Sequence, residues 1–95
     1  MPSLQIDFED GFRGDTVVVS AEGRELWRGE EVTTNLSSNV AAVVRLEVPA
    51  GEPLEVSVPT RGLREEERVG APFLVVRIED DRLVLEPSQE LPVHL

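Results

Sequence analysis

Four carboxylates near the start of the chain are the residues best placed to bind a metal ion. They are Asp7, Glu9, Asp10 and Asp15, and two glycines between the last two permit a tight turn that could fold them around one ion. Calcium takes about six to eight oxygen ligands, and carboxylates are among its usual protein ligands. The spacing differs from that of an EF-hand, because Phe12 stands where an oxygen ligand is needed. The sequence therefore predicts a calcium site in this loop, with a solvated acidic loop as the alternative.

Trp27 is the only tryptophan in the chain and a candidate for binding a carbohydrate. An exposed Trp stacks well on the apolar face of a sugar. In a regular strand the adjacent Leu26 points to the opposite side, so only one of the two is expected to face the core. Trp27 therefore has two interpretations, a ligand residue of a carbohydrate-binding module or a core side chain. The absence of Tyr and the presence of only three Phe leave few aromatic partners for a sugar platform.

The chain offers few side chains for catalysis. It has no Cys, Lys or Tyr, and its one histidine, His94, is the residue before the last, a poor place to fix a proton-transfer geometry. No Gly-x-Ser-x-Gly motif marks any serine as a nucleophile. A pair of carboxylates could cleave a glycosidic bond only across a cleft, and 95 residues leave little room for one. We therefore expect no enzymatic activity and no cofactor apart from the calcium considered above.

The net charge limits the partners that the protein can bind. The chain has 19 acidic and 9 basic residues, all of the latter arginine, which gives a formal net charge of −10 at pH 7. A field of this sign repels nucleic acid and anionic membrane surfaces. No apolar run approaches the length of about 20 residues that a membrane helix needs. We expect a protein partner, preferably a basic one, or a homo-oligomer, and a cytoplasmic location because no secretory leader is apparent.

Apolar residues recur at every second position in short runs, with turn residues between the runs. A period of two is typical of strands with one buried and one solvated face. Strands are predicted over residues 4–9, 16–20, 25–28, 32–36, 40–48, 54–58, 73–79 and 82–86. The run 73–79 starts with consecutive apolar residues, which is typical of a central strand buried on both faces.

The segments between these runs carry turn and charge signals. Residues 35–39 are predicted to form a polar loop, and Asp80-Asp81 a tight turn that could alternatively join the acidic rim. Residues 61–69 are predicted to form a charged edge strand or a loop. The glutamates at 65–67 in this segment have two interpretations, a solvated edge protected by its charge or a docking surface for a basic partner.

The whole pattern predicts an all-β fold, an antiparallel β-sandwich of about seven to nine short strands. It forms one domain over residues 1–95, with 87–95 as an extended C-terminal tail. The architecture is similar to that of immunoglobulin-like or transthyretin-like sandwiches, without the Cys-Trp-Cys pattern of true immunoglobulin domains. A sandwich with so few catalytic side chains favours a non-catalytic interaction module that binds a protein partner or itself. The alternative is a calcium- or carbohydrate-binding module that uses Asp7 to Asp15 and Trp27.

Overall fold

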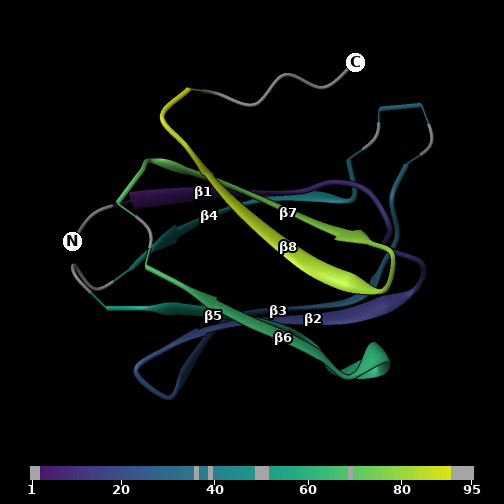
Figure 1. The fold of residues 1–95 in the computed structure, drawn as a ribbon, viewed down its shortest axis with the longest axis horizontal. Coiled ribbons are helices and arrows are strands. Elements are labelled where there is room, and N and C mark those ends of the chain that lie inside the picture. The colour runs from purple at the N-terminus through teal and green to yellow at the C-terminus, as the bar shows by residue number, and fades with distance from the viewer. Residues whose placement is uncertain (1–2, 36, 39, 49–51, 69, 91–95) are drawn as a thin grey trace.

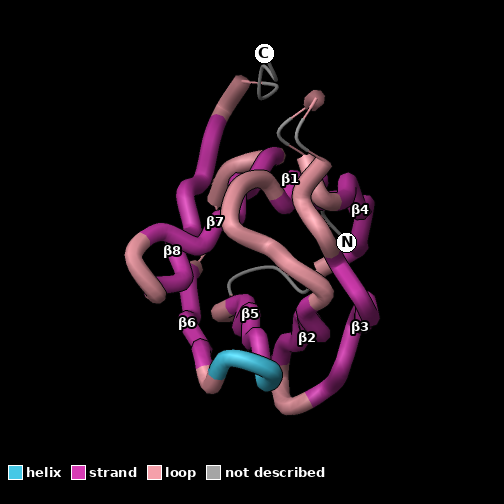
Figure 2. The backbone as a smooth tube through the Cα atoms, turned by 90° about the vertical axis from the view of Figure 1, so that its right-hand side faces the viewer, coloured by secondary structure: helices cyan, strands magenta, loops and turns pink. Residues whose placement is uncertain are grey.

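The chain folds into a sandwich of two four-stranded sheets, shown in Figures 1 and 2. The computed structural model describes residues 3–35, 37, 38, 40–48, 52–68 and 70–90. The strands are β1 (Ser3–Phe8), β2 (Asp15–Ala21), β3 (Arg24–Val32), β4 (Ala42–Glu47), β5 (Leu54–Val58), β6 (Leu63–Glu67), β7 (Phe73–Glu79) and β8 (Arg82–Ser88). Sheet A has the order β4-β1-β7-β8, and sheet B has the order β3-β2-β5-β6. The predicted antiparallel β-sandwich is confirmed, with one exception to the antiparallel pairing in the described strands: β1 and β7 pair in parallel.

The core lies between the two sheets and is built from alternate residues of the inner strands. The following side chains expose at most 2% of their surface: Leu4, Ile6, Phe8, Val17, Val19, Leu54, Val56, Val58, Leu74 and Val76. Burying one such side chain stabilises the fold by about 1.5–3 kcal/mol before entropy is counted. In β7, Val75 is also buried on the outer face, as the apolar start of this run predicts.

Two tight hairpins join neighbouring strands. The central residues of the β2–β3 turn are Glu22 and Gly23, with φ of 53° and 72°, and those of the β7–β8 turn are Asp80 and Asp81, with φ of 49° and 59°. A positive φ at both central positions matches the right-handed twist of the flanking strands. The turn predicted at Asp80-Asp81 is therefore confirmed.

The strand predictions differ from the structure mainly at the sheet edges. The short strand predicted over residues 32–36 does not form in the described part of that segment, because β3 continues to Val32 and Asn35 makes only an isolated bridge to Val40. The charged segment 61–69 does contain an edge strand, β6. The predicted C-terminal tail starts later than expected, since Pro87 and Ser88 still pair with β7; residues 91–95, and with them His94, lie outside the described residues.

The expectation that only one of Leu26 and Trp27 faces the core is wrong. Val19 pairs with Trp27 and Ser20 with Glu25, so Leu26 is an extra residue in β3. Such a β-bulge places two residues of one strand opposite one residue of its neighbour and interrupts the alternation of faces. Both Leu26 and Trp27 consequently pack against the core.

A short 3₁₀ turn, η1 (Pro59–Arg61), follows β5 and precedes β6. Among the described residues no helix has the length and apolar character needed to cross a membrane.

We expect Gly29→Ala to destabilise the protein by about 1–3 kcal/mol, because a Cβ at Gly29 would lie 2.4 Å from Cη2 of Trp27. The indole would have to leave its place on the core. Urea unfolding followed by tryptophan fluorescence measures the loss. Gly70→Ala is the control, since a Cβ at Gly70 meets nothing within 4 Å; equal stability of the two variants would contradict the prediction.

Candidate functional site

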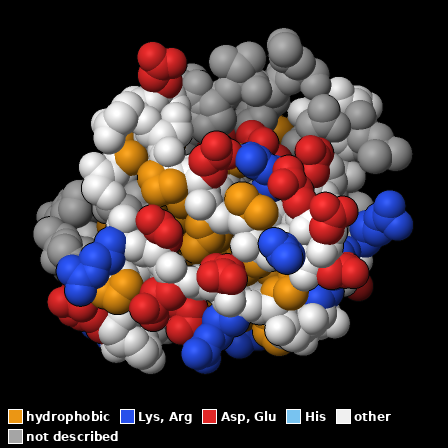
Figure 3. Space-filling model, in the orientation of Figure 1, with side chains coloured by type: hydrophobic (Ala, Val, Ile, Leu, Met, Phe, Trp, Pro, Cys, Tyr) orange, Lys and Arg blue, Asp and Glu red, His pale blue; other side chains and the backbone are white. Residues whose placement is uncertain are grey.

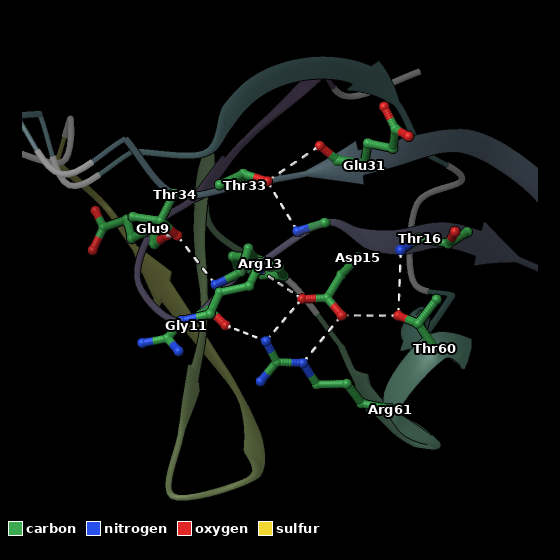
Figure 4. Close-up of polar contacts among 12 residues, drawn as sticks. Glu9, Gly11, Arg13, Asp15, Thr16, Glu31, Thr33, Thr34, Thr60 and Arg61 are labelled. Atoms are coloured by element: carbon green, nitrogen blue, oxygen red, sulfur yellow. Dashed lines mark hydrogen bonds and ion pairs between the residues drawn. The ribbon is translucent and has the colours of Figure 1, made fainter.

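Asp15 forms a charged hydrogen-bond network at one end of the sandwich (Figure 4). Its carboxylate lies at the start of β2 and is buried, with 3% of the residue exposed. One oxygen, Oδ1, accepts hydrogen bonds from Arg61 Nε at 3.1 Å and from the Thr60 hydroxyl at 2.9 Å. The other, Oδ2, accepts from the backbone N–H of Arg13 at 2.8 Å and lies 2.9 Å from Arg61 Nη2. Both oxygens are thus engaged by groups of the protein.

The loop between β1 and β2 is held in place by side chains from two other connections. Arg61 Nη2 donates a hydrogen bond to the carbonyl oxygen of Gly11 at 2.7 Å. The Thr34 hydroxyl accepts from the N–H of Phe12 at 3.1 Å and donates to the carbonyl oxygen of Glu9 at 2.5 Å. The Thr33 hydroxyl accepts from the N–H of Gly14 at 2.9 Å. The loop for which an ion site was predicted is therefore held by hydrogen bonds with Arg61, Thr33 and Thr34, and it closes this end of the sandwich.

The loop sequence suits this tight course. Gly11 has a φ of 95°, and a Cβ there would lie 2.3 Å from the carbonyl oxygen of Ile78 in β7, so only glycine fits. The next residue, Phe12, turns into the core and meets the ring of Phe8 edge to face, with ring centroids 5.7 Å apart. The glycine and the aromatic residue together fix the loop against β7 and β1 of sheet A.

The network lowers the pKa of Asp15 below its ordinary value of 3.8. Burial of the carboxyl, the largest single influence, raises the pKa, but the hydrogen bonds from Arg13, Arg61 and Thr60 and the positive charge of Arg61 outweigh it. Asp15 therefore stays ionised down to an acidic pH and serves as an anchor for Arg61.

The structure does not bring the four predicted calcium ligands together. Asp7 lies in the middle of β1, where its buried carboxylate accepts a hydrogen bond from Gln5 Nε2 at 2.9 Å. Asp10 is exposed, and its carbonyl oxygen accepts from the N–H of Ile78. Glu9 contributes backbone groups to the contacts with Thr34 and Val76. Within the described ranges no three Asp, Glu, His or Cys residues form a group that could hold a metal ion.

Trp27 is partly buried and packs against the core. Its indole stacks on the ring of Phe8, with centroids 5.2 Å apart and an interplanar angle of 23°. The indole also covers Gly29. These contacts support the core interpretation of Trp27, and the bulge that brings Leu26 to the same side explains why the alternation of faces did not show it.

A shallow acidic groove of about 380 Å³ lies at the other end of sheet B. Ser20, Glu55 and Glu66 are directly opposite one another on β2, β5 and β6 and form part of its wall. Glu22 and Glu52 from the adjoining loops complete it. Sequence reasoning missed this groove because its glutamates are far apart along the chain and meet only through strand pairing. Figure 3 shows acidic side chains spread over the visible face with arginines among them.

The edge of sheet A at β4 is the third feature of functional interest. The N–H groups of Gln5 and Glu9 donate toward β7, to Pro72 and Val76. Because backbone groups alternate in direction along a strand, Leu4, Ile6 and Phe8 bond toward β4. The residues opposite them in β4 are Leu46, Val44 and Ala42, and the carbonyl oxygen of Phe8 accepts a hydrogen bond from the N–H of Ala41, just before β4.

The intervening residues of β4, Val43, Arg45 and Glu47, consequently direct their backbone N–H and C=O groups away from the sheet. A row of unpaired backbone groups is a template for another strand. Val43 is 53% exposed and is the exposed large hydrophobic residue of the described chain. Arg45 and Glu47 are exposed and form no ion pair with other described residues.

Comparison with protein-family models, with curated protein sequences and with solved structures finds no match to this chain.

We expect Asp15→Asn to lower the free energy of unfolding by about 1–3 kcal/mol, because Arg61 loses its charged partner while both stay largely shielded from water. Thermal or urea unfolding at neutral pH measures the change. Glu25→Gln is the matched control, since it removes an ion pair to Arg28 in which both side chains are about half exposed, 47% and 48%. A surface pair of this kind contributes less than about 1 kcal/mol, so the prediction fails if the two variants lose equal stability.

The lowered pKa of Asp15 predicts a component of stability that depends on pH. A carboxyl with a lower pKa in the folded state stabilises that state above its unfolded pKa, near 3.8, and the contribution disappears as the pH falls through the folded value. The stability difference between the wild type and Asp15→Asn should thus narrow progressively below about pH 4. Urea unfolding of both proteins from pH 7 to pH 2.5 measures it; a constant difference over this range would refute the assignment.

Proposed function

We propose that this protein is a non-catalytic interaction module that binds a protein strand along the edge strand β4. The observation that carries this proposal is the combination of outward backbone groups, an exposed Val43 and unpaired charges at Arg45 and Glu47 on one regular strand. Strand addition to a sheet edge is a common mode of peptide recognition, in which main-chain hydrogen bonds give affinity and alternate side chains give specificity.

The other three edges carry features that oppose strand addition. β3 has two register shifts and a positive φ of 54° at Glu31, which twist its edge. β6 presents three consecutive glutamates, the arrangement typical of an edge protected by charge. β8 contains Pro87 and runs beside β6, as Figure 2 shows. β4, by contrast, pairs with β1 without a register shift from Ser3–Glu47 to Phe8–Ala42.

The core also remains open beside β4. The inward side chains of the central strands are almost completely buried, whereas Val44, Leu46 and Val48 are only partly buried although they pack against the core. An added strand would cover these side chains and thereby gain hydrophobic stabilisation in addition to the backbone hydrogen bonds. The strongly negative net charge favours partners with basic or balanced segments and disfavours nucleic acid.

We further propose a transthyretin-like rather than an immunoglobulin-like variant of the sandwich. In immunoglobulin constant domains the first, second, fifth and fourth strands share one sheet. Here β1 and β2 lie in different sheets. This strand order supports the assignment.

Selection from a displayed library of random decapeptides tests the role of the β4 edge. We expect peptides selected on the wild type to lose about tenfold or more in affinity for Val43→Pro, which removes an outward N–H without removing a hydrogen bond to β1. Val43→Thr is the control, because it keeps the N–H and the β-branched shape and should bind as the wild type does. Peptides that bind Val43→Pro and the wild type equally would rule out this edge.

A further inference from the structure

We propose that the strand bound by β4 is the β4 strand of a second copy of this chain, antiparallel and with Leu46 directly opposite Leu46 of that copy. This inference rests on the proposed function, because it uses the same edge. It adds the partner, the orientation and the register, and the resulting dimer joins two copies of sheet A into one continuous sheet.

The orientation of the side chains restricts the possible registers. Directly opposed residues in an antiparallel pair direct their side chains to the same face of the sheet. Residues of one β4 whose side chains lie on the outer face of the sheet must therefore oppose residues of the other β4 whose side chains lie on the same face. The outward-facing residues are Val43, Arg45 and Glu47, which alternate with the core-packed Val44 and Leu46.

Charge complementarity selects one of these registers. With Leu46 opposite Leu46, Arg45 of each copy stands directly opposite Glu47 of the other, and the two-fold symmetry forms this pair twice. If the register is shifted so that Arg45 lies on the two-fold axis of the dimer, the two arginines stand opposite each other. A shift that places Val44 at the axis leaves Arg45 opposite Val43. Opposite charges directly across a strand pair are stabilising and like charges are destabilising, so the first register is favoured.

The inner face of β4 fits the same register. Leu46 meets Leu46, and Val44 of each copy stands opposite Val48 of the other. These three side chains pack against the core but are only partly buried in a single chain. Pairing would cover them with identical apolar side chains, and the two cores would become continuous along the joined sheet.

The net charge of each copy does not prevent this pairing. The remaining acidic groups are distributed over the loops and both sheets, including the groove formed by Glu22, Glu52, Glu55 and Glu66 on sheet B and its adjoining loops. At physiological salt the screening length is about 8 Å, so exposed charges beyond this distance repel weakly. At the β4 edge itself, the electrostatic interaction between the copies comes from Arg45 and Glu47, whose charges are opposite.

Analytical ultracentrifugation of charge-swap variants tests the proposal at 0.15 M salt. The wild type is expected to form dimers in a concentration-dependent manner. Arg45→Glu and Glu47→Arg should each weaken dimerisation at least about tenfold, because each places like charges opposite one another twice. An equimolar mixture of the two variants should form a heterodimer, since every pair across the strands is then of opposite charge. The double variant Arg45→Glu with Glu47→Arg should dimerise as the wild type does.

Two controls separate this mechanism from a general effect of charge or of folding. Glu66→Arg changes the net charge as Glu47→Arg does but lies on β6 of the other sheet, and it should leave dimerisation unchanged. Far-UV circular dichroism establishes that each variant keeps its fold. If net repulsion governed association, Glu47→Arg would strengthen the dimer, whereas the proposed register requires it to weaken the dimer.

The possible results distinguish this inference from the proposed function. A wild type that stays monomeric up to about 1 mM, the dissociation constant of a weak complex, overturns the dimer, as does a dimer that is insensitive to the charge swaps. If peptides still lose affinity for Val43→Pro in either case, β4 remains a binding edge for another protein. If they do not, the proposed function fails as well.

Discussion

The pairing of Asp15 with Arg61 is the contact that closes one end of the sandwich. A carboxylate with 3% exposure cannot stay ionised without compensating groups, and here Arg61, Thr60 and the backbone of Arg13 supply them. The pair joins the start of β2 to the turn after β5, and Arg61 also holds the carbonyl oxygen of Gly11. The loop that carries Phe12 into the core is therefore positioned by an ion pair between residues distant in sequence. Asp15, one of the four carboxylates of the acidic loop, thus fixes the fold.

Local patterns in the sequence predicted most of the fold. The alternation in residues 54–58 and 73–79 gave both strands with their observed ends, because a two-residue period reflects the geometry of one strand alone. The two aspartates at 80 and 81 likewise form a turn through their own backbone conformation. The packing of Leu26 beside Trp27 could not be predicted, since the bulge depends on the register between β2 and β3.

The candidate sites show the same division between local and distant effects. The type and spacing of Asp10 and Asp15 are visible in the sequence. The ion pair between Asp15 and Arg61 is not, because Arg61 lies in a segment far along the chain. The edge position of β4 depends on the order of all strands in sheet A. The strand order also decides whether a charged residue lies on an edge strand, where it can oppose or favour the binding of another strand. The edge strand β6 carries three consecutive glutamates, whereas Arg45 and Glu47 of β4 carry opposite charges that can complement a neighbour.

The parallel pairing of β1 with β7 constrains the order in which the chain can assemble. β1 is a central strand of sheet A, yet one of its two neighbours, β7, is synthesised only after β2 to β6. Until β7 is synthesised, the inner edge of β1 has no partner, even when β4 has already paired with the other edge. Sheet B can be completed earlier, because β6 precedes β7 in the chain. Pairing between residues so far apart also slows folding. The nascent chain therefore exposes one edge of a hydrophobic strand from the centre of sheet A until β7 has been synthesised.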